Sequence, residues 1–267
     1  MNKLFLAVLM AFTLIANAFA DGDLRAAMAG AHRAPENVAR DSSRHPYETL
    51  KFFGITPNMP VIELSPGGGW YTEILAPYLR AKGQLIAAAY DPESPTKYFK
   101  KNRADFEKKL ADNPAVYDKV KLSVFEMPNK LDFMPTTQVD MVLTFRNLHN
   151  WSRNGDAAII AAFQKVFNSL KPGGVFGIVD HRLPAAVKQD EKASSGYVHE
   201  AYAIKLAEAV GFKLAAKSEI NANPKDMADY PEGVWTLPPT YALKEKDREK
   251  YQAIGESDRF TLKFVKP

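Results

Sequence analysis

Apolar positions follow two alternating patterns along the chain from residue 60 onward. Short apolar runs predict buried strands, and between them lie longer segments in which apolar residues recur every third or fourth position, as in helices. The predicted strands are 60–64, 84–90, 119–125, 139–145, 175–179, 213–219 and 260–266. The predicted helices are 71–81, 97–110, 156–170 and 197–210.

This alternation predicts an α/β fold with a doubly wound, seven-stranded and mostly parallel sheet. The last run, 260–266, alternates apolar and polar residues and suits an antiparallel edge strand. Between the sixth and seventh strands, the insert 221–257 holds four prolines and four aromatic residues, so we expect an ordered cap. Parallel sheets of this kind bind ligands beyond the carboxyl ends of their strands.

The chain begins with a pattern typical of an export signal. Lys3 precedes an uncharged, largely apolar stretch, 4–16, and Ala18-Phe19-Ala20 then forms a cleavage-type motif. A membrane-spanning helix needs about 20 residues, so a retained anchor is the less favoured alternative. We expect cleavage and a periplasmic location, with no membrane contact after cleavage.

Between this signal, 1–20, and the first strand lies a polar segment, 21–59. It predicts one or two short helices, interrupted near Pro35 and Pro46, that form a lid over the site. The remaining domain, 60–267, then carries the sheet and the insert.

Composition excludes several classes of function. The chain has no cysteine, which excludes thiol catalysis, thiolate metal sites and disulfides. Its net charge of +4 is small and dispersed, so we expect no nucleic-acid partner. A small molecule is the expected ligand, and the oligomeric state is not indicated.

A glycine-rich loop, VIELSPGGGWYTE, follows the first predicted strand at 61–73. It does not match a phosphate-binding P-loop, because no Gly-Lys-Ser/Thr follows. A dinucleotide fingerprint starting at Gly67 fails as well, because Thr72 stands where the last glycine belongs. A plain tight turn is the structural alternative.

The loop resembles motif I of the class I S-adenosylmethionine (SAM) methyltransferases, acid-x-Gly-x-Gly-x-Gly. Glu63 matches the acid, Gly67 and Gly69 match the second and third glycines, and Ser65 replaces the first. The Pro-Gly-Gly-Gly-Trp-Tyr variant, preceded by RHPYETLKFFG at 44–54, is most similar to a group of exported bacterial predicted methyltransferases. The similarity runs across nearly the whole chain after the signal.

The resemblance implies SAM as cofactor and a set of residues that contact it. The glycines and Ser65 would face the methionyl end, and Glu63 the cationic parts of the ligand. Asp91, after the second strand, would accept from the ribose hydroxyls, although it also suits an Asp-Pro turn, with Glu93 as a substitute. Glu126, beside Met127, would contact adenine, unless it is a solvated loop acid.

A polar and aromatic cluster, FRNLHNW at 145–151, follows the fourth predicted strand. It resembles the motif of small-molecule methyltransferases that borders the methyl group and its acceptor, and Phe145 would lie on the SAM side. His149 suits a general base, and a histidine that only shapes the loop is equally compatible. Asn147 would orient a ligand, and we group it and Arg146 with His149 as catalytic candidates.

Candidate contacts to the acceptor are spread along the chain. They are Arg44, His45, Tyr71, His181 and Trp235. We expect no metal: no spacing matches a closed zinc site, and Asp140 begins its strand, which opposes a magnesium site with Asp180 and Asn147.

These features predict SAM-dependent methyl transfer to a small molecule. The alternative is an exported ligand-binding protein that has a methyltransferase fold and no catalytic activity.

Overall fold

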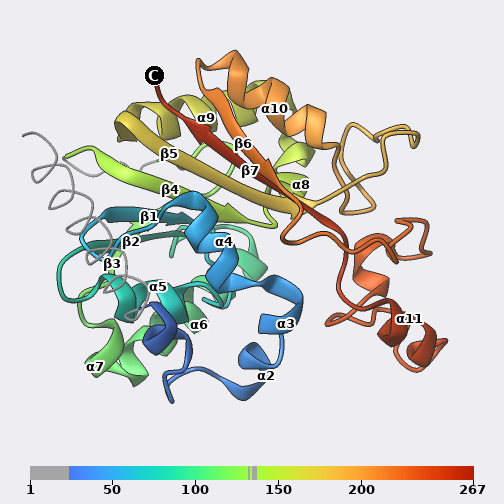
Figure 1. The fold of residues 1–267 in the computed structure, drawn as a ribbon, viewed down its shortest axis with the longest axis horizontal. Helices are drawn as coiled ribbons and strands as arrows, with labels where there is room; N and C mark the ends of the chain where they lie inside the picture. The colour runs from blue at the N-terminus through green and yellow to red at the C-terminus, as the bar shows by residue number, and fades with distance from the viewer. Residues whose placement is uncertain (1–23, 132, 134–136) are drawn as a thin grey trace, which may run out of the picture.

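The computed structural model describes residues 24–131, 133 and 137–267, so the predicted signal peptide lies outside the described residues. Seven strands form one sheet in the order β3-β2-β1-β4-β5-β7-β6 (Figure 1). The strands are β1 (Pro60–Leu64), β2 (Gln84–Ala89), β3 (Lys121–Val124), β4 (Val139–Phe145), β5 (Leu170–His181), β6 (Lys213–Ser218) and β7 (Arg259–Val265).

The sheet is parallel from β3 to β5 and antiparallel on both sides of β7. The predicted α/β class and the mostly parallel sheet are therefore confirmed. The antiparallel pairing lies at the edge predicted for it, although β7 itself is one strand in from that edge and β6 is outermost.

Helices cover both faces of the sheet (Figure 1). One face packs against α9 (Asp156–Ser169) and α10 (Glu200–Ala209). In α9 the buried residues Ile159, Ala162, Phe163 and Val166 recur at helical spacing, which is why the sequence pattern located this helix. The other face packs against α4 (Pro46–Phe53), α5 (Thr72–Leu79), α6 (Lys97–Asp112) and α7 (Pro114–Tyr117).

Two local expectations differ from the structure. β5 begins at Leu170, five residues before the predicted start, because Gly173 and Gly174 exchange backbone hydrogen bonds with Lys266 at the end of β7. The segment before β1 forms more helices than the one or two predicted, among them α2 (Pro35–Val38), α3 (Asp41–Arg44) and α4; the breaks lie near Pro35 and Pro46 as predicted, and each proline begins the helix that follows. Proline suits a first helical position because its missing N–H has no partner there.

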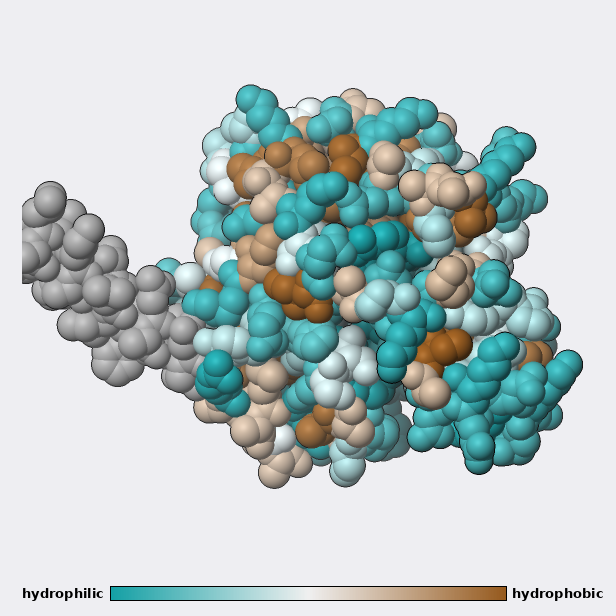
Figure 2. All heavy atoms as spheres, turned by 45° about the vertical axis from the view of Figure 1, so that its right-hand side comes forward, coloured by the Kyte–Doolittle hydropathy of each residue, from teal (hydrophilic) through white to brown (hydrophobic). Residues whose placement is uncertain are grey.

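The N-terminal helices and the insert lie at the carboxyl end of the strands (Figure 1). The N-terminal segment contains α2 and α3 (Asp41–Arg44), and the insert contains η2 (Gly233–Thr236) and α11 (Arg248–Ile254). The expectation that the insert forms an ordered cap stays a prediction. Figure 2 shows a mainly hydrophilic surface on the side to which the insert projects.

Candidate functional site

The glycine loop leaves β1 with its backbone in the left-handed region three times. The φ angles of Ser65, Gly67 and Gly69 are 50°, 58° and 78°. A Cβ added at Gly67 or Gly68 would meet nothing within 4 Å, so the loop presents open backbone to a ligand. The Ser65 hydroxyl is buried and has no hydrogen-bond partner among the described residues. A buried hydroxyl without a partner at an open loop is available to a ligand.

Glu63 lies beneath this loop. Its carboxylate accepts a hydrogen bond of 2.6 Å from the Thr72 hydroxyl at the start of α5. Burial raises the pKa of Glu63 to about 7, and the Thr72 hydrogen bond and Lys109 oppose that rise. Glu63 thus links the end of β1 to the start of α5 through this hydrogen bond. It lies directly below the glycine loop, and its predicted contact with the ligand stays a prediction.

Replacing Glu63 with glutamine tests this burial. The folded carboxyl keeps its proton up to about pH 7, against 4.5 for an exposed one, so the folded state binds more protons between these values. Stability of the wild type should therefore fall across that window, by up to about 3 kcal/mol. Urea denaturation at several pH values should show this fall in the wild type and in an exposed control, E48Q, and not in E63Q. The same dependence of unfolding free energy on pH in all three proteins would contradict the raised pKa of Glu63.

An aromatic cavity of about 410 Å³ opens beside the loop at the ends of β1, β2 and β4. Tyr90 and Phe99 stack in it, with ring centroids 4.2 Å apart and planes within 13°. The lining also includes Ser65, Met127, Asn150, Trp151 and Trp235. Flat rings and one free hydroxyl suit a ligand with an aromatic base and polar groups. Sequence reasoning missed Tyr90, Phe99 and Trp151, although Tyr90 directly precedes Asp91.

Asp91 and Glu126 connect the ends of β2 and β3. Asp91 accepts from the backbone N–H of Glu93 at 2.9 Å and lies 3.3 Å from the Lys130 ammonium, and both interactions lower its pKa. Glu126 accepts from the Ser94 hydroxyl and from the backbone N–H of Asp91. Both acids thus have protein partners at the predicted sheet edge, and their contacts with ribose and adenine stay predictions.

Phe145 and Asn147 hold the end of β4 against the loop. The Phe145 ring stacks on Tyr71, with centroids 3.5 Å apart. The Asn147 amide donates to the carbonyls of Leu64 and Ser65, each at 3.2 Å. Asn147 therefore fixes the loop backbone. Tyr71 is only 5% exposed and packs beneath the site; it lines neither the aromatic cavity nor a second cavity, near the arginines, that is described below.

His149, in the short helix α8 (Leu148–Trp151) that follows β4, forms a buried pair with Asp180 of β5. His149 Nδ1 lies 2.8 Å from Asp180 Oδ1, and Asp180 Oδ2 accepts from the His149 backbone N–H at 3.1 Å. Asp180 is fully buried at the end of β5. With the Asp180 carboxylate as hydrogen-bond acceptor, a neutral His149 carries its proton on Nδ1 and has Nε2 available as a proton acceptor. The sequence singled out His149 but did not reveal that it pairs with Asp180.

His181 adjoins this pair. Its ring centroid lies 5.1 Å from that of His149, and its Nδ1 is 2.5 Å from the Ser257 hydroxyl. Burial, together with His149 and Arg259, lowers the pKa of His181 well below its usual value, so its imidazole is neutral.

His149, Asp180 and His181 offer potential metal-ligand atoms within 4.8 Å of one another. Both Asp180 oxygens already accept hydrogen bonds, and a group of nearby arginines opposes a further cation. The expectation of no metal stays a prediction.

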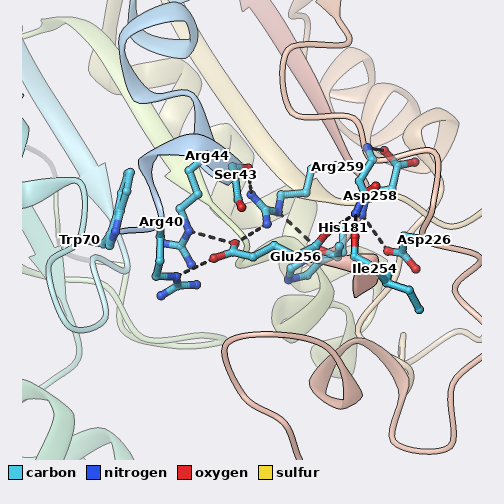
Figure 3. A network of polar contacts seen from close by, with 12 residues as sticks. Arg40, Ser43, Arg44, Trp70, His181, Asp226, Ile254, Glu256, Asp258 and Arg259 are labelled. Atoms are coloured by element: carbon cyan, nitrogen blue, oxygen red, sulfur yellow. Dashed lines mark hydrogen bonds and ion pairs between the residues drawn. The ribbon is translucent and has the colours of Figure 1, made fainter. Parts of the chain in front are cut away.

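Three of these arginines share one carboxylate, that of Glu256 in the insert (Figure 3). Arg40 Nε lies 2.6 Å from Glu256 Oε1, and Arg44 Nε lies 3.1 Å from Oε2. Arg259, at the start of β7, also pairs with Oε2 and donates to the Ser43 carbonyl. These ion pairs tie the N-terminal segment to the insert, and nothing in the sequence signalled them.

A second cavity, of about 260 Å³, lies between this cluster and His149. Its lining includes Arg40, Arg44, Arg146, Arg259, Glu256, His149, His181, Asn150 and Trp235. Asn150 and Trp235 line both cavities, so the two adjoin beside His149. Of the predicted acceptor contacts, Arg44, His181 and Trp235 line this second cavity, whereas His45 lies at the joint between α3 and α4 and does not.

Comparisons with known proteins agree with the architecture. No family model and no curated protein sequence matches the chain. Among solved structures, a SAM-dependent methyltransferase from Aquifex aeolicus is 16% identical, with a TM-score of 0.57 over 86% of this chain and 93% of that chain. The glycopeptide N-methyltransferase MtfA, solved with S-adenosyl-L-homocysteine (SAH), is 17% identical, with a TM-score of 0.54 over 88% and 99%.

A putative sarcosine dimethylglycine methyltransferase from Galdieria sulphuraria is 14% identical, with a TM-score of 0.56 over 86% of each chain. At these identities the likeness establishes the fold. The chain has the α/β fold of SAM-dependent methyltransferases. In the described part of the chain, none of the helices has the length and apolar character needed to cross a membrane.

Proposed function

We propose that this protein transfers a methyl group from SAM to a small-molecule acceptor. The observation that carries the proposal is that two cavities adjoin beside His149, since Asn150 and Trp235 line both. One cavity lies next to the glycine loop and the other next to the arginines. Methyl transfer needs a donor and an acceptor held in line in adjoining pockets, and a proton acceptor at their junction assists when the acceptor loses a proton.

The first cavity fits SAM in its chemistry. Open backbone at Gly67 and Gly68 suits close approach of the methionyl end, and the Ser65 hydroxyl lacks a partner until a ligand supplies one. The Tyr90 and Phe99 rings offer flat surfaces for adenine. MtfA, which shares the fold, has been solved with SAM and with sinefungin.

His149 is the proposed general base. When bound, SAM supplies a reactive methyl group on its sulfonium sulfur. His149 Nε2 would take the proton from the acceptor hydroxyl or amine as the acceptor's lone pair bonds to the methyl carbon; the bond from that carbon to sulfur would break, its electron pair would stay on sulfur, and SAH would leave. Asp180, buried beside the ring, would stabilise the imidazolium formed and fixes the ring orientation through Nδ1. Asn147 holds the loop, and Trp235 helps to exclude water.

Isothermal titration of the purified protein with SAM and SAH tests the proposal. We expect saturable binding of both, and transfer of labelled methyl from SAM to a component of a small-molecule extract. Absence of binding at high micromolar concentrations would overturn the proposal. Binding without transfer to any acceptor would favour the alternative, a ligand-binding protein that has the fold without activity.

Replacing Ser65 with alanine separates stability from binding. Without ligand, removal of a buried hydroxyl that has no partner should raise the free energy of unfolding by about 1 kcal/mol. Loss of its hydrogen bond to SAM should weaken binding about fivefold, again close to 1 kcal/mol. Urea denaturation and titration measure the two effects, with S43A as the control outside the loop. Unchanged SAM affinity in S65A would remove Ser65 from the cofactor site.

We also propose that the chain is exported to the periplasm, as its first 20 residues and its resemblance to exported methyltransferases indicate. Cell fractionation and N-terminal sequencing test this proposal. A mature protein that begins at Asp21 in the periplasm supports it, and a cytoplasmic protein that retains Met1 would overturn it.

A further inference from the structure

We propose that the acceptor carries an anionic group, a carboxylate or a phosphate, which binds to the arginines of the second cavity. This inference rests on the proposed function, since it names the class of the methyl acceptor.

The first support is the charge of the cavity. Four arginines line it, and the only carboxylate among its lining residues is that of Glu256. Even with the buried Asp180 counted, two positive charges remain in excess. His181, with its lowered pKa, adds none. A partly enclosed site with this excess attracts and retains an anion.

Arg44 supplies the second, independent observation. Its side chain is only 4% exposed, and its Nε pairs with Glu256, yet its Nη1 is buried without a hydrogen-bond partner among the described residues. The Trp70 ring holds the guanidinium from one side, 4.8 Å from its centroid. A buried charged N–H without a partner is costly, and an oxygen of an anion bound in the cavity would satisfy it.

Glu256 cannot supply acceptors for all the N–H groups of these arginines. Arg40 and Arg44 point toward it from the N-terminal segment, and Arg259 approaches from β7 (Figure 3). One carboxylate shared by three guanidinium groups leaves donors free, and carboxylate and phosphate oxygens match the planar fork of arginine.

Arg146 relates the position of the bound anion to that of His149, the proposed general base. It lies at the end of β4, three residues before His149, with φ of 61° and its backbone N–H bonded to the Val179 carbonyl. Its side chain lines the same cavity as His149. An acceptor held by Arg44 and Arg146 through its anionic end therefore has its hydroxyl or amine within the cavity that His149 borders. Arg146 is thus a binding residue for the acceptor.

The test is titration of the full protein, without SAM, with 4-hydroxybenzoate, its neutral counterpart 4-hydroxybenzamide, and inorganic phosphate. We expect an anion to bind at least tenfold more tightly than the amide, and its affinity to fall with added salt. Tighter binding of benzoate or of phosphate identifies which anion the site prefers, and either supports the inference.

The variants are R146Q and R44Q, each expected to weaken anion binding at least tenfold, with R80Q as a control. Arg80 pairs with Asp118 and does not line the cavity, although its Nε, like Arg44 Nη1, is buried without a hydrogen-bond partner among the described residues. R146Q keeps the test valid if R44Q does not fold, because Arg146 is half-buried. Equal binding of the amide, or wild-type anion affinity in folded R146Q, would overturn the inference.

Failure of the two proposals gives different results. Anion binding in a protein that never binds SAM would overturn the proposed function and leave the anion site in place. SAM binding with transfer only to neutral acceptors would support the proposed function and overturn the anion site.

Discussion

Replacing His149 with glutamine is expected to lower the rate of methyl transfer by about 10²–10⁴-fold, the usual loss on removal of a general base. Glutamine is polar and close to histidine in size, but it has no basic nitrogen. The initial rate should be measured with the acceptor found in the extract, at saturating SAM.

SAM affinity in H149Q should stay within a few-fold of the wild type, since His149 does not line the first cavity. The control is H199Q, the same substitution at a histidine outside both cavities, whose Nε2 contacts only the Val187 carbonyl among the described residues. Transfer at the wild-type rate in folded H149Q would assign His149 a purely structural role.

Replacing Gly67 with valine is expected to weaken SAM binding at least 100-fold, or about 3 kcal/mol. The φ of 58° is strained for a β-branched residue, and the new side chain would enter the open space above the loop. Titration calorimetry measures the affinity, and thermal denaturation measures the stability.

Gly173 provides a matched control for this change. Its φ is 77°, and a Cβ added there would also meet nothing within 4 Å, but it lies near the start of β5, outside both cavities. G173V should therefore lose a similar amount of stability and keep its SAM affinity. Equal affinities in G67V and G173V would show that the glycine loop does not contact SAM.

The sequence located most of the fold because its signals are local. The buried stripe of α9 and the apolar run of β4 each show their period within one element, so neither depends on distant residues. Element ends were less predictable. β5 starts at Leu170 because Lys266, nearly a hundred residues later, pairs with its glycines.

At the candidate site, the sequence identified the residues that follow strand ends. Ser65 and His149 fell where a parallel sheet gathers its ligands, and both lie beside the cavities. The pairing of His149 with Asp180 was not predictable, because it depends on β4 and β5 lying side by side, with Phe145 opposite Val179, so that α8 begins beside the end of β5.

By itself, the sequence determined the alternation of strands and helices, the glycine loop, and the polar residues that follow the carboxyl ends of the strands. Each of these is a short-range pattern. Only the tertiary structure decided which charges meet. Arg40 and Glu256 are 216 positions apart, yet their charged groups lie 2.6 Å apart. Such contacts form when the N-terminal segment and the insert close over the same sheet edge, and no local pattern encodes that meeting.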